Sequence, residues 1–178
     1  AGLPFEDYPS FRNSFNEVYS LKAHRLQLGF LKLIKGAPIR DQVEEHDYVY
    51  RSKAPFEIIS SKYMSADAII QLKKIEKLLD LYYNRGGFMR TLLFAENLAE
   101  TPFDFFEELA DYYYTKGFQL KAHKKEDLYR IFYIYAGWRE RSIPGIRNQI
   151  KELLFEDMQE TLNPDAIKKF LRKGWEIQ

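Results

Sequence analysis

Residues 65–82 read SADAIIQLKKIEKLLDLY, and this stretch decides the fold class. Ser65 is a favourable helix-capping residue, and the apolar side chains after it recur every three or four positions, as on one face of an α-helix. The stretch therefore predicts a long helix whose buried stripe is formed by Ile69, Leu72, Ile75, Leu79 and Tyr82.

The rest of the chain repeats this helical pattern. Thr101-Pro102 and Asn163-Pro164 each place a capping side chain before a proline, which favours the start of a helix. Apolar spacing indicates further helices around residues 128–135, from about residue 144 to 158, and, as a shorter helix, over residues 88–97. The second half of the sequence therefore predicts a multi-helix domain.

Three similar phrases, residues 80–86, 111–117 and 173–175, raise the question of an internal repeat. No helical-repeat signature of a known period accompanies them. Each phrase places a basic residue before a glycine and an aromatic residue after it, which is a common way to end a helix. We interpret the phrases as three helix ends.

The sequence before residue 63 has a different pattern. Asp7 can cap a helix with Phe11, Phe15, Val18 and Tyr19 at helical spacing. The stretch HRLQLGFLKLI, residues 24–34, alternates as a strand does, with Leu26, Leu28 and Phe30 on one face and Gln27, Gly29 and Leu31 on the other.

A loop follows this strand, then a short helix around residues 39–45 and a second strand at residues 55–60. Helix, strand, loop and strand indicate a fragment of an α/β layer, because an apolar strand of this kind suits a parallel sheet. We therefore predict an α+β fold that is predominantly α-helical, with a short β segment in residues 1–62 and a helical domain in residues 63–178.

The composition excludes several kinds of chemistry. The 178 residues include no Cys, so this chain offers no disulfide, thiolate nucleophile, thiolate zinc site or iron-sulfur ligand. Its 14 Phe, 13 Tyr and 2 Trp supply the apolar area of a core. No apolar run is long enough for a membrane span, and the first residues lack the pattern of a signal peptide. We expect a soluble, cytoplasmic chain without a membrane partner.

The charge pattern bears on nucleic acid as a partner. The formal net charge is +1, and only residues 116–178 lean basic, with 13 Lys and Arg against 9 Asp and Glu. Most of these cations alternate with acids, which is typical of a solvated helix surface and argues against nucleic acid. The run Lys168, Lys169, Arg172 and Lys173 is interpreted as a complement to a helix dipole.

The sequence contains no constellation typical of a catalytic or metal site. His46 has acidic neighbours, but they lack the spacing of metal ligands, and a surface turn is the preferred interpretation. Glu107 and Glu108 diverge around a helix and are expected to face solvent. Tyr112-Tyr113-Tyr114 could offer bases a stacking platform, but we interpret it as core with a partly exposed rim. We predict no catalytic residue and no metal ligand.

The polar face of residues 24–34 is the remaining candidate. Gln27 and Gly29 lie where a cleft would open, and Gly36 and Pro38 follow the strand, at the end where α/β folds bind ligands. Gly29 would allow a ligand to approach closely, although a glycine inside a strand also marks a bulge.

Two stretches carry a resemblance to a known family, GLPFEDYPSF at residues 2–11 and HRLQLGFLKLIKGAP at residues 24–38. They resemble the last part of the barrel of radical S-adenosylmethionine enzymes, where a similar loop precedes the fifth helix and the sixth strand ends in Gly-Thr-Pro. Residues 48–50, 55–60 and 81–88 resemble the uncharacterised C-terminal domain of cobalamin-binding members of that family. Ala37 departs from the family pattern, because it stands where a threonine is usual.

The resemblance implies that residues 1–62 are the remnant of a truncated barrel and that residues 63–178 are an accessory domain. Gln27, Gly36 and Pro38 would lie near the nucleoside of S-adenosylmethionine in the intact protein. The cysteine loop that holds the iron-sulfur cluster, and any cobalamin-binding domain, would lie before residue 1. This chain alone would then be non-catalytic and contain no cofactor, and it would cover the barrel and contribute to substrate or partner binding.

The resemblance also implies partners. The first partner would be the upstream barrel of the same protein. Without it, residues 25–34 would have unpaired edges, from which we expect a rearranged N-terminal region or a homodimer. The alternatives are an RNA-binding helical module and a protein-interaction domain.

Overall fold

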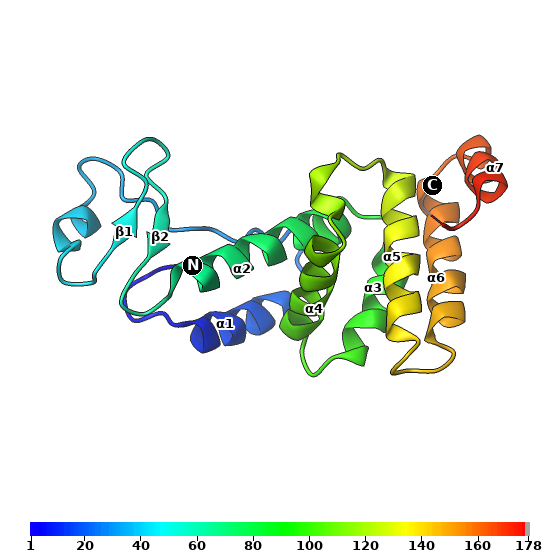
Figure 1. The fold of residues 1–178 in the computed structure, drawn as a ribbon, viewed down its shortest axis with the longest axis horizontal. Coiled ribbons are helices and arrows are strands. Elements are labelled where there is room, and N and C mark those ends of the chain that lie inside the picture. Colours follow the sequence, from blue (N-terminus) through cyan, green and yellow to red (C-terminus); the bar gives the residue numbers. More distant parts are fainter. Residues whose placement is uncertain (177–178) are drawn as a thin grey trace. The chain divides into compact units, whose positions relative to one another are not determined.

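Residues 1–176 are described in a computed structural model, and they contain seven α-helices and one two-stranded sheet (Figure 1). Helix accounts for 60% of the structure, so the predicted α+β fold, predominantly helical, is confirmed. The chain divides into two compact units, Ala1–Glu76 and Lys77–Gln178. This division falls inside a helix, C-terminal to the boundary expected after residue 62. The barrel and accessory-domain assignment stays a prediction.

Helix α1, Tyr8–Ser20, begins where the sequence predicts. The Ser10 amide donates to Asp7 Oδ1 (2.9 Å) and the Asp7 amide donates to Ser10 Oγ (3.0 Å), which forms a capping box. Phe11, Phe15 and Tyr19 are buried as expected. Val18 is 43% exposed, because it lies at the edge of this stripe, on the side of Phe11 away from Phe15 and Tyr19.

The sheet of the N-terminal unit is shorter than predicted and antiparallel. Strand β1, Val49–Tyr50, pairs with β2, Ile58–Ser60, which confirms part of the second predicted strand. The expected parallel sheet is wrong for these two strands. A short 3-10 helix, η1, covers Pro38–Gln42 where a helix around residues 39–45 was expected.

Residues 24–34 do not form the predicted strand. The segment is extended, but its only ladder contact within the described chain is an isolated bridge from Lys32 to Glu57. The alternation itself is present in part, since Leu28 is buried and Gln27 and Gly29 are exposed. A strand needs a continuous neighbour as well as alternation, and the described residues supply only two short ones, Ala1 beside Gly29 and Leu31 and residues 56–58 beside Leu31 and Leu33.

Helix α2, Ala66–Leu78, follows Ser65, whose hydroxyl oxygen accepts from the Ala68 amide (3.2 Å). All five residues of the predicted stripe are buried. The helix continues directly into a turn of π-helix, η2, Leu79–Asn84, which ends with the Arg85 amide donating to the Asp80 carbonyl (3.1 Å). Local sequence patterns therefore predict the position of this helix, but not its change of winding.

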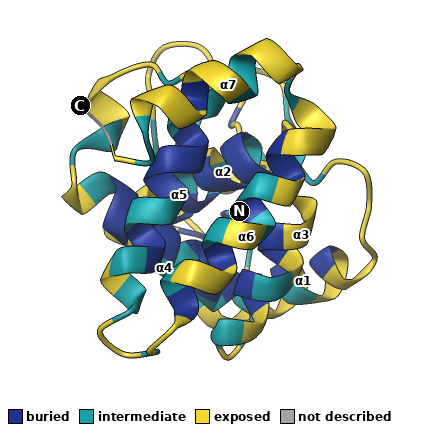
Figure 2. Cartoon of the chain, turned by 90° about the vertical axis from the view of Figure 1, so that its right-hand side faces the viewer, coloured by how far each residue is buried: buried dark blue, intermediate teal, exposed yellow. Residues whose placement is uncertain are grey.

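The C-terminal unit holds the remaining helices. Helices α5 and α6 lie side by side, and α3 lies against α6 (Figure 1). Figure 2 shows α7 as mostly exposed, and Phe170 is its one buried residue in the part of the chain that is described. The elements are α3 (Met89–Ala95), η3 (Glu96–Leu98), α4 (Pro102–Thr115), η4 (Phe118–Leu120), α5 (Lys125–Arg139), α6 (Ile146–Thr161) and α7 (Pro164–Lys173).

The predicted helix ends of this unit are confirmed. Gly86, Gly117 and Gly174 have φ angles of 65°, 74° and 84°, in the left-handed region that favours glycine. Aromatic side chains fill the core behind these ends, with ring centroids 4.5 Å apart for Phe88 and Tyr129 and 4.9 Å apart for Tyr82 and Phe88. The helical unit is therefore held largely by aromatic packing.

Candidate functional site

A cavity of about 590 Å³ lies in the N-terminal unit, beside the extended segment that includes Gln27. One side is the backbone and side chains of residues 27–32, and the other is formed by Glu57, before β2, and by Lys73 and Glu76 of α2. Residues 27–32 are extended, so they line the cavity as one continuous side. Lys73 and Glu76 stand one helical turn apart, so they lie on the same face of α2. All of these residues belong to the same compact unit.

Hydrogen bonds hold one edge of the extended segment. The Leu31 amide donates to the Ala1 carbonyl (2.9 Å), and the Ala1 nitrogen donates to the Gly29 carbonyl. Farther along, the Leu33 amide donates to the Phe56 carbonyl (2.8 Å) and the Ile58 amide donates to the Leu31 carbonyl (2.9 Å). Residues 29, 31 and 33 therefore bond in one direction, as alternate residues of a strand do.

An ion pair and a cation over an aromatic ring form the wall opposite. Lys73 Nζ donates to Glu57 Oε1, and the same ammonium lies 4.6 Å from the centre of the Phe30 ring. The charges of Lys73 and Glu57 therefore offset each other, and the aromatic face adds a further attraction for the ammonium. The cavity combines a neutralised ion pair, an aromatic ring and strand backbone.

The structure brings only part of the predicted site together. Gln27 is exposed and lines the cavity, as does Gly29. Gly36 and Pro38 are exposed outside the lining, Gly36 with a φ of 83° and Pro38 at the start of η1. The three residues expected near a nucleoside thus do not share one cavity in this chain, and their role in an intact protein stays a prediction.

Sequence patterns missed the wall opposite Gln27. Lys73 and Glu76 lie on the polar face of the helix at residues 65–82, where the spacing predicts solvent-facing residues. Glu57 lies in the predicted second strand and is opposite Lys32 in the bridge. The sequence contains a weak indication of this ion pair, because Glu57 and Lys73 are oppositely charged and both lie on predicted elements. Only the tertiary structure brings the two side chains into contact.

His46 lies in a turn, as expected, but its side chain is not at the surface. Its side chain is buried, with 3% of the residue exposed, and its Nδ1 lies 3.0 Å from the Tyr63 hydroxyl. The rings of Phe5 and Tyr48 pack against it, with centroids 5.8 Å and 5.5 Å away. An exposed side chain was expected wrongly because Phe5 and Tyr63, which are distant in sequence, cover the imidazole together with nearby Tyr48. Within residues 1–176, no group of three or more His, Cys, Asp or Glu side chains is placed to hold a metal ion.

Glu108 also differs from its expected solvent-facing position. It accepts from the Tyr135 hydroxyl (2.5 Å) and from Arg139 Nη1 (2.5 Å), both on α5. Arg139 Nη2 donates to the Leu98 carbonyl (2.9 Å), so this network joins α4, α5 and η3. Burial, together with the Glu108 charge, raises the pKa of Tyr135 far above its ordinary value. Tyr135 is therefore a hydrogen-bond donor here and not a base.

The Tyr112-Tyr113-Tyr114 run is core with a partly exposed rim, as predicted. Tyr112 and Tyr113 are buried and Tyr114 is half-buried. The ring of Tyr112 contacts Tyr135 and Trp138 of α5, with centroids 5.5 Å and 5.3 Å away. The run therefore packs α4 against α5 and presents no continuous stacking surface.

The comparisons with known proteins identify a family. Residues 44–177 match the family model described as Protein of unknown function (DUF4080). A search of curated proteins and a search of solved structures each gave no match. No helix among residues 1–176 has both the length and the apolar character needed to cross a membrane. Because the match covers most of its length, the chain belongs to the DUF4080 family of proteins of unknown function.

Proposed function

We propose that this chain is a non-catalytic accessory part of a radical S-adenosylmethionine enzyme. In this proposal residues 1–62 are the end of the enzyme's barrel, and residues 63–178 cover the barrel and contribute to substrate or partner binding. The sequence resemblance of residues 2–11 and 24–38 supports the proposal. The chain that precedes residue 1 would supply the three-cysteine loop.

The observation that carries the proposal is the hydrogen bonding of Ala1. Its nitrogen bonds to the Gly29 carbonyl and its carbonyl to the Leu31 amide, on either side of Phe30. This pattern is that of neighbouring parallel strands, in which one residue bonds to the two that flank its partner. The connection between the two segments contains α1. A strand, a helix and a parallel strand are the repeating unit of an α/β barrel.

The chain's own residues fit only part of the cofactor set. It has no Cys, so it cannot hold the cluster itself. The exposed side chain of Gln27 beside an open cavity suits a hydrogen-bonding role toward a nucleoside, whereas Gly36 and Pro38 lie outside that cavity. No reaction step is therefore assigned to residues of this chain.

The experiment is a comparison of this chain with the longer protein that contains it. After anaerobic iron-sulfur reconstitution, we expect the longer protein to cleave S-adenosylmethionine to 5′-deoxyadenosine and this chain to be inactive. In the longer protein, Gln27→Ala is expected to raise the KM for S-adenosylmethionine, whereas Gln119→Ala, an exposed glutamine of η4, leaves it unchanged. A preceding sequence without the three-cysteine loop, or a reconstituted protein without cluster absorbance, would refute the proposal.

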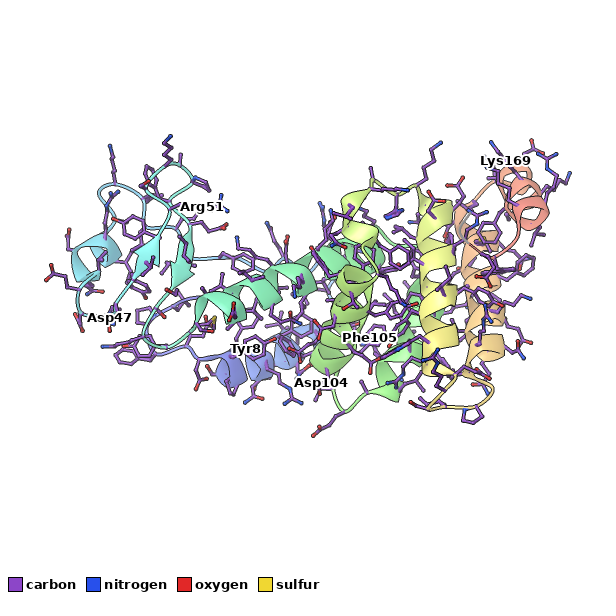
Figure 3. The ribbon with its side chains drawn as sticks, in the orientation of Figure 1. Tyr8, Asp47, Arg51, Asp104, Phe105 and Lys169 are labelled. Atoms are coloured by element: carbon purple, nitrogen blue, oxygen red, sulfur yellow. The ribbon has the colours of Figure 1, made fainter. Side chains whose placement is uncertain are left out.

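RNA binding is the second candidate, and the cations of α7 favour it. Lys168, Lys169, Arg172 and Lys173 are all exposed, and Figure 3 shows Lys169 extending from the surface of α7. Binding through phosphates would weaken steeply with salt. A fluorescent single-stranded RNA, titrated at low and moderate salt, tests this candidate, with Lys168→Glu/Lys169→Glu as the variant. Absence of binding at low salt would eliminate it.

A further inference from the structure

We propose that the free edge of residues 28–32 is a docking site for an extended, acidic peptide strand, which adds to the segment by backbone hydrogen bonds. The inference goes beyond the radical-enzyme proposal and does not depend on it. It uses only the hydrogen bonds and charges of the N-terminal unit.

As far as the chain is described, residues 28–33 form hydrogen bonds along only one edge. Gly29, Leu31 and Leu33 use their backbone groups toward Ala1 and residues 56–58. The N–H and C=O groups of Leu28, Phe30 and Lys32 point the other way in an extended chain, and none of them bonds to another group in the described part of the protein. The segment therefore has one paired edge and one open edge.

A cavity runs along this segment. The cavity of about 590 Å³ is lined by the whole of residues 27–32, so it follows the segment along its length. Phe30 is half-buried and Lys32 is exposed, so the edge is within reach of an incoming chain. An open edge of this kind is the usual acceptor for strand addition.

The charge of the edge selects the partner. Between Glu17 and Asp41 the sequence contains no acidic residue, but it contains five cations: Lys22, Arg25, Lys32, Lys35 and Arg40. On the opposite wall of the cavity, Glu57 is paired with Lys73, and Glu76 is a second acid. Of the five cations only Lys32 lines the cavity, but the segment with which an added strand would pair carries cations and no acid, so it favours an acidic strand over a basic one.

The open edge suits a peptide strand better than a nucleic acid. The open edge presents donors and acceptors in alternation, N–H and C=O at each of Leu28, Phe30 and Lys32. A phosphate backbone offers acceptors to such an edge and leaves the three carbonyls without donors. A peptide strand satisfies both kinds of group. A second copy of this same segment would place basic residues against basic residues.

The test uses the full chain and a defined probe, the fluorescent peptide acetyl-Val-Glu-Val-Glu-Val-Glu-amide. We expect saturable binding by anisotropy, and amide exchange by NMR at least about tenfold slower at Phe30 and Lys32 in the complex. The amides of Leu31 and Leu33, which are already bonded, should change little. Lys32→Glu should weaken binding about fivefold. Lys53→Glu, the same charge change at an exposed lysine off the edge, should not weaken it.

Four outcomes would overturn the proposal. The first is equal binding of the peptide with every backbone amide N-methylated, because that analogue keeps the charges and loses the donors. The second is an absence of binding by the unmodified peptide. The third is protection of Phe30 and Lys32 that grows with protein concentration without peptide, which would make a second copy the occupant. The fourth is peptide displacement by oligouridylate with unchanged amide exchange at the edge, which would indicate attraction of any polyanion.

Discussion

Asp157 shows how much a single buried carboxylate contributes to the helical unit. It belongs to α6, yet it accepts from the Arg90 amide (3.1 Å), the Thr91 amide (3.0 Å) and the Thr91 hydroxyl (2.7 Å) at the start of α3. Phe88, the residue at the N-cap position of α3, provides no side-chain cap. One helix therefore caps another, which couples the two elements more tightly than apolar contact alone.

We predict that Asp157→Ala lowers the free energy of unfolding by about 2 kcal/mol, because it leaves two amides and a hydroxyl without their acceptor. Urea denaturation followed by circular dichroism measures this change. Glu156→Ala is the control, since Glu156 is exposed and its carboxylate lies 3.6 Å from Arg90 Nε. Equal losses for the two variants would show that the cap is unimportant.

Tyr129 gives a pH prediction at the same scale. Burial is the main cause that raises its pKa to about 12, and its hydroxyl donates to the Gly87 carbonyl (2.7 Å). An unfolded tyrosine titrates near pH 10. The folded state therefore holds the Tyr129 proton more tightly than the unfolded state does. The protonated hydroxyl stabilises the folded state fully below pH 10, and this stabilisation is lost as the pH rises toward 12.

The measurement is phenolate absorbance from pH 9 to 13. Tyr129→Phe should remove one late-titrating hydroxyl. A late phase that is identical in the Tyr129→Phe variant would contradict the assignment.

At the scale of elements, the turn after the π-helix is fixed by its neighbours. Gly86 and Gly87 have φ angles of 65° and 82°. Lys125 Nζ donates to the carbonyls of Arg85 (3.0 Å) and Gly86, which places a cation at the negative end of the helix. Burial and the nearby Arg85 charge lower the pKa of Lys125. The turn between η2 and α3 is thereby attached to α5.

Two alanine substitutions distinguish conformation from crowding at this turn. A Cβ at Gly86 would meet nothing within 4 Å. Gly86→Ala should therefore lower the free energy of unfolding by about 1 kcal/mol, because only the left-handed backbone conformation is strained. A Cβ at Gly87 would lie 2.8 Å from Lys125 Cε and 2.9 Å from Thr161 Cγ2, so Gly87→Ala should cost about 3 kcal/mol. Thermal unfolding of both variants measures the difference. A smaller loss for Gly87→Ala than for Gly86→Ala would contradict the packing described here.

At the scale of the whole molecule, the family match and the compact units have different boundaries. The match begins at residue 44, whereas the N-terminal unit is Ala1–Glu76. Residues before 44 are integral to that unit, because Tyr48 donates its hydroxyl to the Gly2 carbonyl (3.2 Å) and Ile58 donates its amide to Leu31. A chain cut at the family boundary would lose these contacts.

We therefore predict that deletion of residues 1–43 removes amide protection at Ile58 and leaves the helices of residues 77–178 formed, since their core lies within their own unit. Hydrogen exchange by mass spectrometry checks both regions in one experiment. A deletion of residues 1–3 serves as the milder comparison. Unchanged protection at Ile58 in the larger deletion would show that residues 1–43 are dispensable for this unit.

The sequence predicted helix starts well because capping is local. Asp7, Ser65, Thr101 and Asn163 each lie at a helix start in the structure, and each accepts from an amide three residues later. Each of these hydrogen bonds joins residues three positions apart in the chain, so a stretch of four residues is enough to predict it.

The failures involve partners that are distant in sequence. Residues 24–34 alternate as a strand does, but a strand also depends on a neighbour, and that information lies in residues 56–58 and Ala1. His46 is buried by Phe5 and Tyr63, which are distant in sequence, as well as by nearby Tyr48. Of the candidate site, Gln27 was accessible to sequence reasoning, whereas its opposing lysine was not.

The π-helical turn at Leu79–Asn84 has a consequence for how this gene can vary. Its bonds span five residues where an α-helix spans four, so the turn contains one residue more than an uninterrupted α-helix would need. Loss of a single codon here could be absorbed as tighter coiling, with the flanking segments still in phase. Elsewhere in the same helix such a loss would rotate every later side chain by about 100°.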